Sequence, residues 1–240
     1  MRVTGLLTLV LLIFAGQSFV NEANQKRTTS VEPLQLPSGE CTDQWTGTIT
    51  YRVITNKKGT AENKVNFSHW NEEGFYETNA QLDGRRNDQG AAIAIVKAAA
   101  HETKEWGSRG KGVCYRETDN SQAVRGTANE TTTAFSITFD PYTREYSVLA
   151  PTLMVYASGE LTVSSRVKGT CNNPYNKDRN QVTKIERYQL SDDAPVLIGK
   201  GRIDPAKPDE FTGTETVEHD TNRGKKTVTI KWDLRRCAKQ

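Results

Sequence analysis

Two polar residues interrupt the apolar side of a predicted strand near the C-terminus. In the segment FTGTETVEHD, Glu215 and His219 alternate with Phe211, Gly213 and Val217, so all five would face the same way in an extended chain. Carboxylates and imidazoles are common general acids and bases. Glu215 and His219 are therefore the candidate catalytic residues.

The spacing of these two residues argues against a joint role. Residues four apart on a strand are separated by about 13 Å along its axis, too far for a direct hydrogen bond. If they face inward, each therefore needs its own partner, and a buried carboxylate requires a cation or several donors. If the strand is central, we expect Glu215 to form a structural ion pair with the cationic segment from Arg223 to Lys231, whereas on an edge strand inward charges would oppose aggregation. Catalysis is the alternative.

Other catalytic and cofactor signatures are missing from the sequence. The segment HETKE, starting at His101, falls one residue short of a zinc-protease motif, because Glu105 stands where the second His belongs. The glycine-rich stretch 107–112 matches neither the P-loop nor the dinucleotide fingerprint, and no G-x-S-x-G elbow is present. The sequence predicts no metal and no cofactor, and favours a protein without catalytic activity.

Aromatic side chains flank the tetrapeptide Asn71 to Gly74, which we predict to be a hairpin turn. Aromatic rings near a loop tip can stack on sugar faces or anchor a protein partner. We favour the interpretation that most of these rings fill the core, with Trp70 the most exposed, and binding is the alternative. The candidate binding residues are His69, Trp70, Phe75 and Tyr76.

The elements expected to position these residues are β-strands. In 45–53 and 227–235, apolar side chains alternate with Thr and charged residues, as in half-buried antiparallel strands, and Trp45 and Trp232 fall on the apolar sides. The alanine-rich stretch 91–106 suits a helix by propensity, but we favour a strand. The predicted fold is all-β, an antiparallel β-sandwich.

The pattern Ser-Arg-x-Lys-Gly-x-Cys occurs twice, starting at Ser108 and at Ser165. Similar short blocks follow each copy in the same order, so residues 108–140 and 165–233 are interpreted as two related β units. A chance match is the alternative. Four cysteines predict two disulfides, whose connectivity the sequence leaves open: Cys41, Cys114, Cys171 and Cys237.

The N-terminal residues predict the compartment. Residues 1–18 resemble a secretory signal peptide, 19–40 a flexible leader, and 41–240 a disulfide-linked β domain. The apolar run is shorter than the roughly 20 residues that span a bilayer, so no membrane span is expected. We predict a secreted or periplasmic protein, with glycosylation sequons at Asn66 and Asn129 relevant in a eukaryote.

The balance of charged residues bears on which class of ligand the protein binds. The chain has 32 Lys and Arg against 29 Asp and Glu, which does not indicate a nucleic-acid ligand. The leading hypothesis is a secreted, non-catalytic binding or interaction protein that acts through loops or a sheet face, with an extracellular carbohydrate or protein as its ligand. The alternative is a secreted, glycan-directed hydrolase that uses carboxylates.

Overall fold

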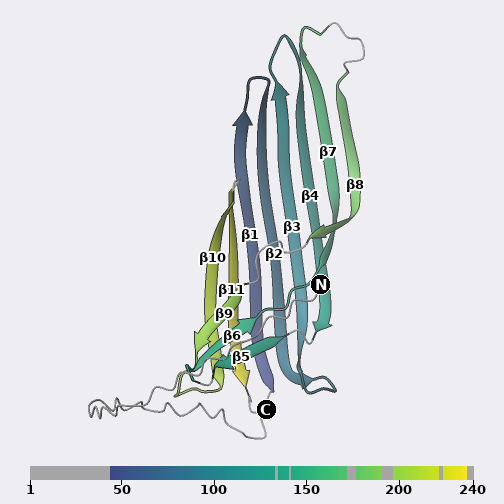
Figure 1. Ribbon diagram of the computed structural model, residues 1–240. Helices are drawn as coiled ribbons and strands as arrows, with labels where there is room; N and C mark the ends of the chain where they lie inside the picture. Colours follow the sequence, from purple (N-terminus) through teal and green to yellow (C-terminus); the bar gives the residue numbers. More distant parts are fainter. Residues whose placement is uncertain are drawn as a thin grey trace, which may run out of the picture. The chain divides into compact units, whose positions relative to one another are not determined.

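The computed structural model describes residues 44–132, 135–140, 142–171, 177–190, 197–221 and 224–236. These residues form strands and no helix, which confirms the predicted all-β antiparallel fold (Figure 1). Within them, no helical segment could cross a membrane. The predicted signal peptide and leader lie outside the described residues, as do Cys41 and Cys237.

Eight strands form one antiparallel sheet in the order β10-β11-β1-β2-β3-β4-β7-β8. Their bounds are β1 Trp45–Glu62, β2 Asn66–Arg86, β3 Ala92–Gly110, β4 Cys114–Thr132, β7 Val155–Gly169, β8 Arg179–Leu190, β10 Glu210–Thr221 and β11 Gly224–Arg236. A second sheet, in the order β5-β6-β9, packs against one face of the first. Its strands are β5 Ser136–Asp140, β6 Glu145–Leu149 and β9 Ile198–Arg202.

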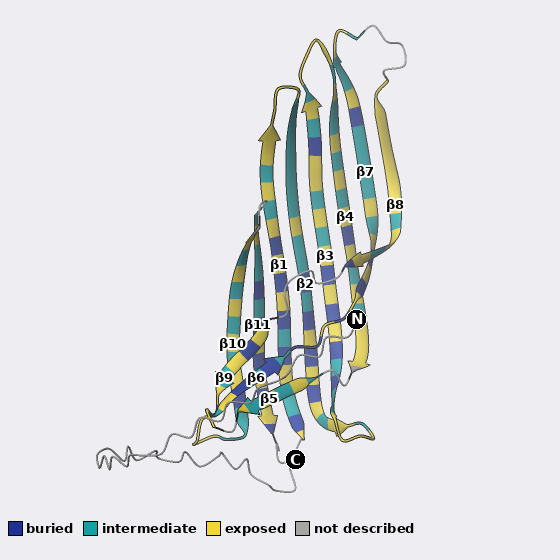
Figure 2. Ribbon diagram, viewed as in Figure 1, coloured by how far each residue is buried: buried dark blue, intermediate teal, exposed yellow. Residues whose placement is uncertain are grey.

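One face of the large sheet, the inner face, carries the hydrophobic core. Along β1, buried Ile49, Tyr51 and Val53 alternate with residues of the opposite, outer face, as the sequence pattern predicts. Figure 2 shows the buried bands crossing neighbouring strands. Trp45 is 5% exposed and Trp232 is 2% exposed, so both are core residues as predicted.

The small sheet packs on the inner face through aromatic rings and glycines. A Cβ atom added at Gly199 of β9 or at Gly213 of β10 would overlap the Trp232 indole, so the ring lies against both glycines. The Trp232 Nε1 donates to the Tyr146 hydroxyl at 3.1 Å, and the Tyr146 ring packs edge-on against Phe211. The glycines therefore bring the two sheets close around buried rings.

The segment between β6 and β7 crosses the inner face over β2. The Tyr76 hydroxyl donates to the Leu153 carbonyl at 2.7 Å and accepts from the Leu153 amide at 2.9 Å, and Thr78 donates to the Pro151 carbonyl at 3.0 Å. We call the part of the large sheet on the small-sheet side of this crossing the covered half. The rest, the open half, comprises residues 56–73, 103–122, 160–171 and 177–186, and no apolar side chain described there is buried.

Two local expectations concern β2 and β3. The predicted turn at Asn71–Gly74 is wrong, because these residues lie within β2, which continues from Asn66 to Arg86. The alanine-rich stretch 91–106 belongs largely to β3, which confirms the strand interpretation. The chain instead turns near Asn87, whose side-chain oxygen accepts from the amides of Gln89 and Ala91.

The repeated Ser-Arg-x-Lys-Gly-x-Cys pattern occupies two strand ends in the open half. The first copy ends β3 and enters β4, and the second copy ends β7, which pairs with β4. Cys114 and Cys171 form a disulfide with Cα atoms 5.1 Å apart. At Gly169, φ is 86° and a Cβ would overlap the Val113 carbonyl, so this glycine permits the close approach beside the disulfide.

Candidate functional site

The predicted binding residues divide between the two faces of β2. Trp70 and Tyr76 lie on the inner face, whereas His69 and Phe75 lie on the outer face. Their separation follows from strand alternation once Asn71–Gly74 is extended rather than turned. Tyr76 is 6% exposed and held by its two hydrogen bonds to Leu153, so it is a core residue.

On the outer face, the His69 ring lies against its register partner Gly107, and Phe75 makes separate contacts. Phe75 stacks on His101 with ring centres 5.2 Å apart, and Arg52 lies 5.6 Å from the Phe75 centre. A hollow of about 620 Å³ adjoins these rings, with Ala99 among its lining residues. The neighbours of Phe75 occupy ring surface that a stacking ligand would need, so this hollow is a weaker candidate than the inner face.

Trp70 has an aromatic neighbour on the inner face that sequence reasoning missed. Trp106 of β3 is the register partner of Trp70, and directly opposed residues in a sheet have Cβ atoms about 5 Å apart. Gly59 of β1 opposes Trp70 on its other side, where a Cβ would overlap the indole. Trp106 is 37% exposed and Trp70 is half-buried. We call this pair the tryptophan platform.

Hydrogen-bonding groups flank the tryptophan platform on both sides. Towards the strand ends lies a row of hydroxyl residues, and the Ser108 and Thr118 hydroxyls lie 2.9 Å apart. Towards the covered half, Lys104 pairs with Glu102 at 2.8 Å and donates to Tyr188 at 3.3 Å. Other polar inner-face residues near the platform are Ser68, Ser165, Lys57, Glu72, Asn120 and Gln122.

Two ion pairs hold charged side chains in place at the border of the platform. Lys57 and Glu72 are register partners and pair at 2.9 Å. Burial opposes the charged form of Lys104, but the hydrogen bond and charge of Glu102 outweigh it and raise the Lys104 pKa. The platform is therefore an apolar strip bounded by polar groups.

The candidate catalytic residues lie on the edge strand β10. Glu215 and His219 are half-buried on the inner side, as the alternation predicts. Glu215 accepts a hydrogen bond from the main-chain amide of Lys200 in β9 at 3.1 Å, and no ion pair between described residues involves it. Since β10 is an edge strand, the ion pair expected for a central strand does not apply, and Glu215 instead makes a contact that links the two sheets. His219 is the register partner of Lys226.

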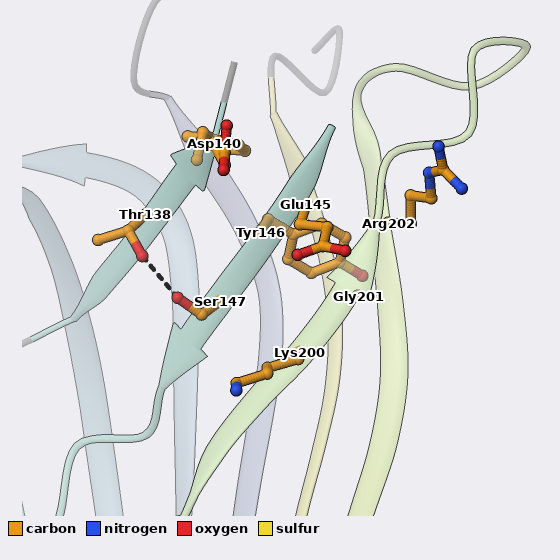
Figure 3. A pocket seen from close by; sticks show the side chains of 9 residues that line it. Thr138, Asp140, Glu145, Tyr146, Ser147, Lys200, Gly201 and Arg202 are labelled. Carbon is orange, nitrogen blue, oxygen red and sulfur yellow. Dashed lines mark hydrogen bonds between the residues drawn. The ribbon is translucent and has the colours of Figure 1, made fainter. Parts of the chain in front are cut away.

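A second group of polar residues lines a hollow of about 450 Å³ on the small sheet. Figure 3 shows Thr138 hydrogen-bonded to Ser147, and Lys200 and Arg202 extending in opposite directions. Asp140 and Glu145 are register partners, the arrangement that a carboxylate-based hydrolase would need. However, the Tyr142 and Thr143 amides donate to Asp140 and lower its pKa, whereas a general acid needs a raised pKa. Asp140 thus stabilises its hairpin.

Neither metal-binding side chains nor comparison with known proteins indicates a function for this chain. Within the described ranges, no group of three or more His, Cys, Asp or Glu residues could hold a metal ion. Comparison with protein-family models, curated proteins and solved structures gave no match for this chain.

The turn between β2 and β3 has a sequence signal that could have identified Trp106 as the partner of Trp70. Asn87 and Gly90 flank a plausible turn, and a hairpin folded about Asp88 places Trp70 opposite Trp106. The predicted turn at Asn71–Gly74 concealed this pairing, because it ended the first strand before the true hairpin. The platform thus depends on register between two long strands.

Proposed function

We propose that the protein is a non-catalytic binding protein whose tryptophan platform binds a polysaccharide. The observation that carries the proposal is the pairing of Trp70 with the more exposed Trp106 on a part of the sheet that no described element covers. Indole faces provide apolar area with little side-chain entropy to lose, and sugar rings present C–H faces that stack on them. A carbohydrate is therefore favoured over a protein as the ligand.

The surroundings of the platform support the same ligand class. Sugar hydroxyls need both donors and acceptors, and the adjoining hydroxyl and amide residues offer both. Asn120 is the register partner of Trp106, and the neighbouring rows contain Ser108 and Thr118 on one side and Gln122 on the other. A bound chain would stack on the indoles and hydrogen-bond along their edges.

We infer that this binding takes place outside the cytoplasm. A disulfide between Cys114 and Cys171 fits an oxidising compartment, and residues 1–18 have the pattern of a signal peptide. We further propose that Cys41 pairs with Cys237, the two cysteines left over. Residues 108–140 and 165–233 remain a proposed internal repeat.

A polysaccharide panel tests the platform. The chain is run through native gels containing the neutral polymers β-glucan, xylan or mannan, and tryptophan fluorescence is recorded during titration with each polymer that retards it. Trp106→Ala should weaken binding by roughly tenfold, because a lost aromatic contact is worth about 1 kcal/mol or more. Tyr142→Ala is the matched control, since Tyr142 is 67% exposed and lies on the small sheet's hairpin.

The outcomes separate the possible roles of the two rings. Retardation that is lost in Trp106→Ala and kept in Tyr142→Ala supports the platform. Equal binding by wild type and Trp106→Ala, or no binding to any polymer, contradicts it. A thermal unfolding measurement on each variant excludes loss of binding through misfolding.

A further inference from the structure

Another hollow lies at the strand ends of the open half, on the face opposite to the tryptophan platform. It has a volume of about 530 Å³ and adjoins the β1–β2 and β3–β4 hairpins. Its lining residues are Glu62, Phe67, Arg109, Gly110, Lys111, Gly112 and Tyr115. Phe67 and Arg109 are register partners on the outer face, so a ring and a guanidinium adjoin at its floor.

Both cations that line this hollow are held in position by neighbouring groups. Arg109 donates to the Tyr115 hydroxyl at 3.0 Å, and its guanidinium carbon lies 5.3 Å from the centre of the Tyr115 ring. Lys111 pairs with Glu62 and also donates to the Asn63 carbonyl at 2.9 Å. Because these side chains are already partly ordered, binding an anion costs less conformational entropy than at free surface cations.

The hairpin that carries these cations is tied to its neighbour. Cys114 directly follows the β3–β4 turn and is joined to Cys171 at the end of β7, and the Thr170 amide donates to the Val113 carbonyl at 2.8 Å. These two links fix the position of the turn relative to β7. Lys111 and Tyr115 are therefore presented from a cross-linked strand end.

The charge around the hollow favours an anion. At these strand ends, residues 60–69, 107–118, 165–171 and 177–180 contain eight cations and three carboxylates, with Arg116 and Arg179 on the inner face. Asp178 accepts from the Val167 amide, and Glu62 is paired with Lys111, so two of these carboxylates are already engaged. The cations are Lys64, Arg109, Lys111, Arg116, Arg166, Lys168, Lys177 and Arg179, and the carboxylates are Glu62, Glu117 and Asp178.

The lining itself indicates a ligand with a single negative charge. Arg109, Lys111 and Glu62 together have a formal charge of +1, which matches one carboxylate or one sulfate ester. The Glu62 carboxylate can accept hydrogen bonds from ligand hydroxyls, whereas it would repel a densely charged polyphosphate. Phe67 and Tyr115 offer ring surface to the apolar side of a sugar.

We propose that this hollow binds an acidic sugar residue, with its carboxylate or sulfate at Arg109 and Lys111. The sugar ring lies against Phe67 or Tyr115, and its hydroxyls donate to Glu62. The site does not depend on the tryptophan platform, because the two lie on opposite faces of the sheet.

Calorimetric titration of the full chain tests this site with three tetrasaccharide probes: an oligogalacturonate, a sulfated glucan oligomer and a neutral glucan oligomer. Either acidic probe should bind, and the two acidic arms distinguish a carboxylate from a sulfate. Arg109→Gln and Lys111→Gln should each weaken acidic binding by about tenfold or more, because a charge-assisted hydrogen bond is lost. Trp106→Ala should leave this affinity unchanged, which separates the site from the platform.

Arg166→Gln is the matched control for net charge. Arg166 lies on the outer face of β7 in the open half and does not line the hollow. An affinity within about threefold of wild type supports a specific site, since only screened, longer-range attraction is lost. Equal losses in Arg109→Gln and Arg166→Gln, binding of the neutral probe by Trp106→Ala as tight as its binding of the acidic probes, or no binding of either acidic probe would overturn the proposal.

Discussion

The two halves of the large sheet consist largely of the same strands but are stabilised in different ways. In the covered half, β1 buries Ile49, Tyr51 and Val53 beneath the small sheet and its connections. In the open half, the same strand continues as Asn56–Glu62 without a buried side chain. Hydrogen bonding can therefore extend the sheet beyond its hydrophobic core.

Polar pairs and one disulfide take the place of the core in the open half. Lys57–Glu72 and Lys104–Glu102 pair across or along strands, and Ser108 bonds to Thr118. Exposed ion pairs contribute about 0–1 kcal/mol each, much less than a buried aromatic side chain. The Cys114–Cys171 bond is the strongest single constraint there. We expect this half to open locally more readily than the covered half.

The sequence predicts the covered half because burial imposes a pattern. One face of each strand there must be apolar, so 45–53 and 227–235 alternate visibly, and Trp45 and Trp232 could be assigned to the core. The antiparallel sandwich follows from such strands. The glycines Gly199 and Gly213, which accommodate Trp232, have no comparable signal, because their contacts are with residues distant in sequence.

The strands of the open half could not be predicted from apolar alternation, because both faces of the sheet are largely polar there. β4, Cys114–Thr132, has no apolar alternation and was not predicted as a strand. Asn71–Gly74 has turn-forming residues that a solvated strand tolerates. The candidate site was therefore predicted only in part: Trp70 was named, whereas Trp106 and the register that joins them were not.

The largest expected effect is loss of stability in Trp232→Ala. The 2% exposed indole packs against Gly199 and Gly213, and its removal should cost about 3–5 kcal/mol. Urea unfolding monitored by circular dichroism measures this cost. Trp106→Ala in the open half should cost about 1 kcal/mol or less. Equal losses in the two variants would mean that the open half has a core of its own.

The next effect concerns the disulfide. Replacing both Cys114 and Cys171 by Ser removes a cross-link between residues 57 apart in sequence, which is worth about 4 kcal/mol in a chain-entropy model and commonly about 2–4 kcal/mol. Hydrogen exchange should accelerate mainly in β4, β7 and β8 of the open half. Faster exchange confined to β1 and β11 would contradict the proposed division between the halves.

A smaller effect is expected for Glu215→Gln, which tests the contact between the two sheets. Glutamine keeps an oxygen that can accept from the Lys200 amide, so only the charge-assisted part of the bond is lost, about 1 kcal/mol. Chemical denaturation measures the change, and polysaccharide binding should be unaffected. Normal stability with lost binding would instead place Glu215 in a ligand site.

The smallest expected effect is a change in the pKa of Glu62, an exposed carboxylate of the open half. The hydrogen bond and charge of Lys111 lower the pKa of Glu62, so this contact stabilises the fold above the ordinary glutamate pKa, and the contribution disappears as the pH falls through the lowered value. Lys111→Ala should return the Glu62 pKa toward its usual range in a carboxyl NMR titration. Asp140 on the small sheet is the internal control, because main-chain amides lower its pKa and Lys111 is not among the causes. A shift in both carboxyl groups would show that the substitution acts through the whole molecule, and an unchanged Glu62 would mean that Lys111 is not its partner in solution.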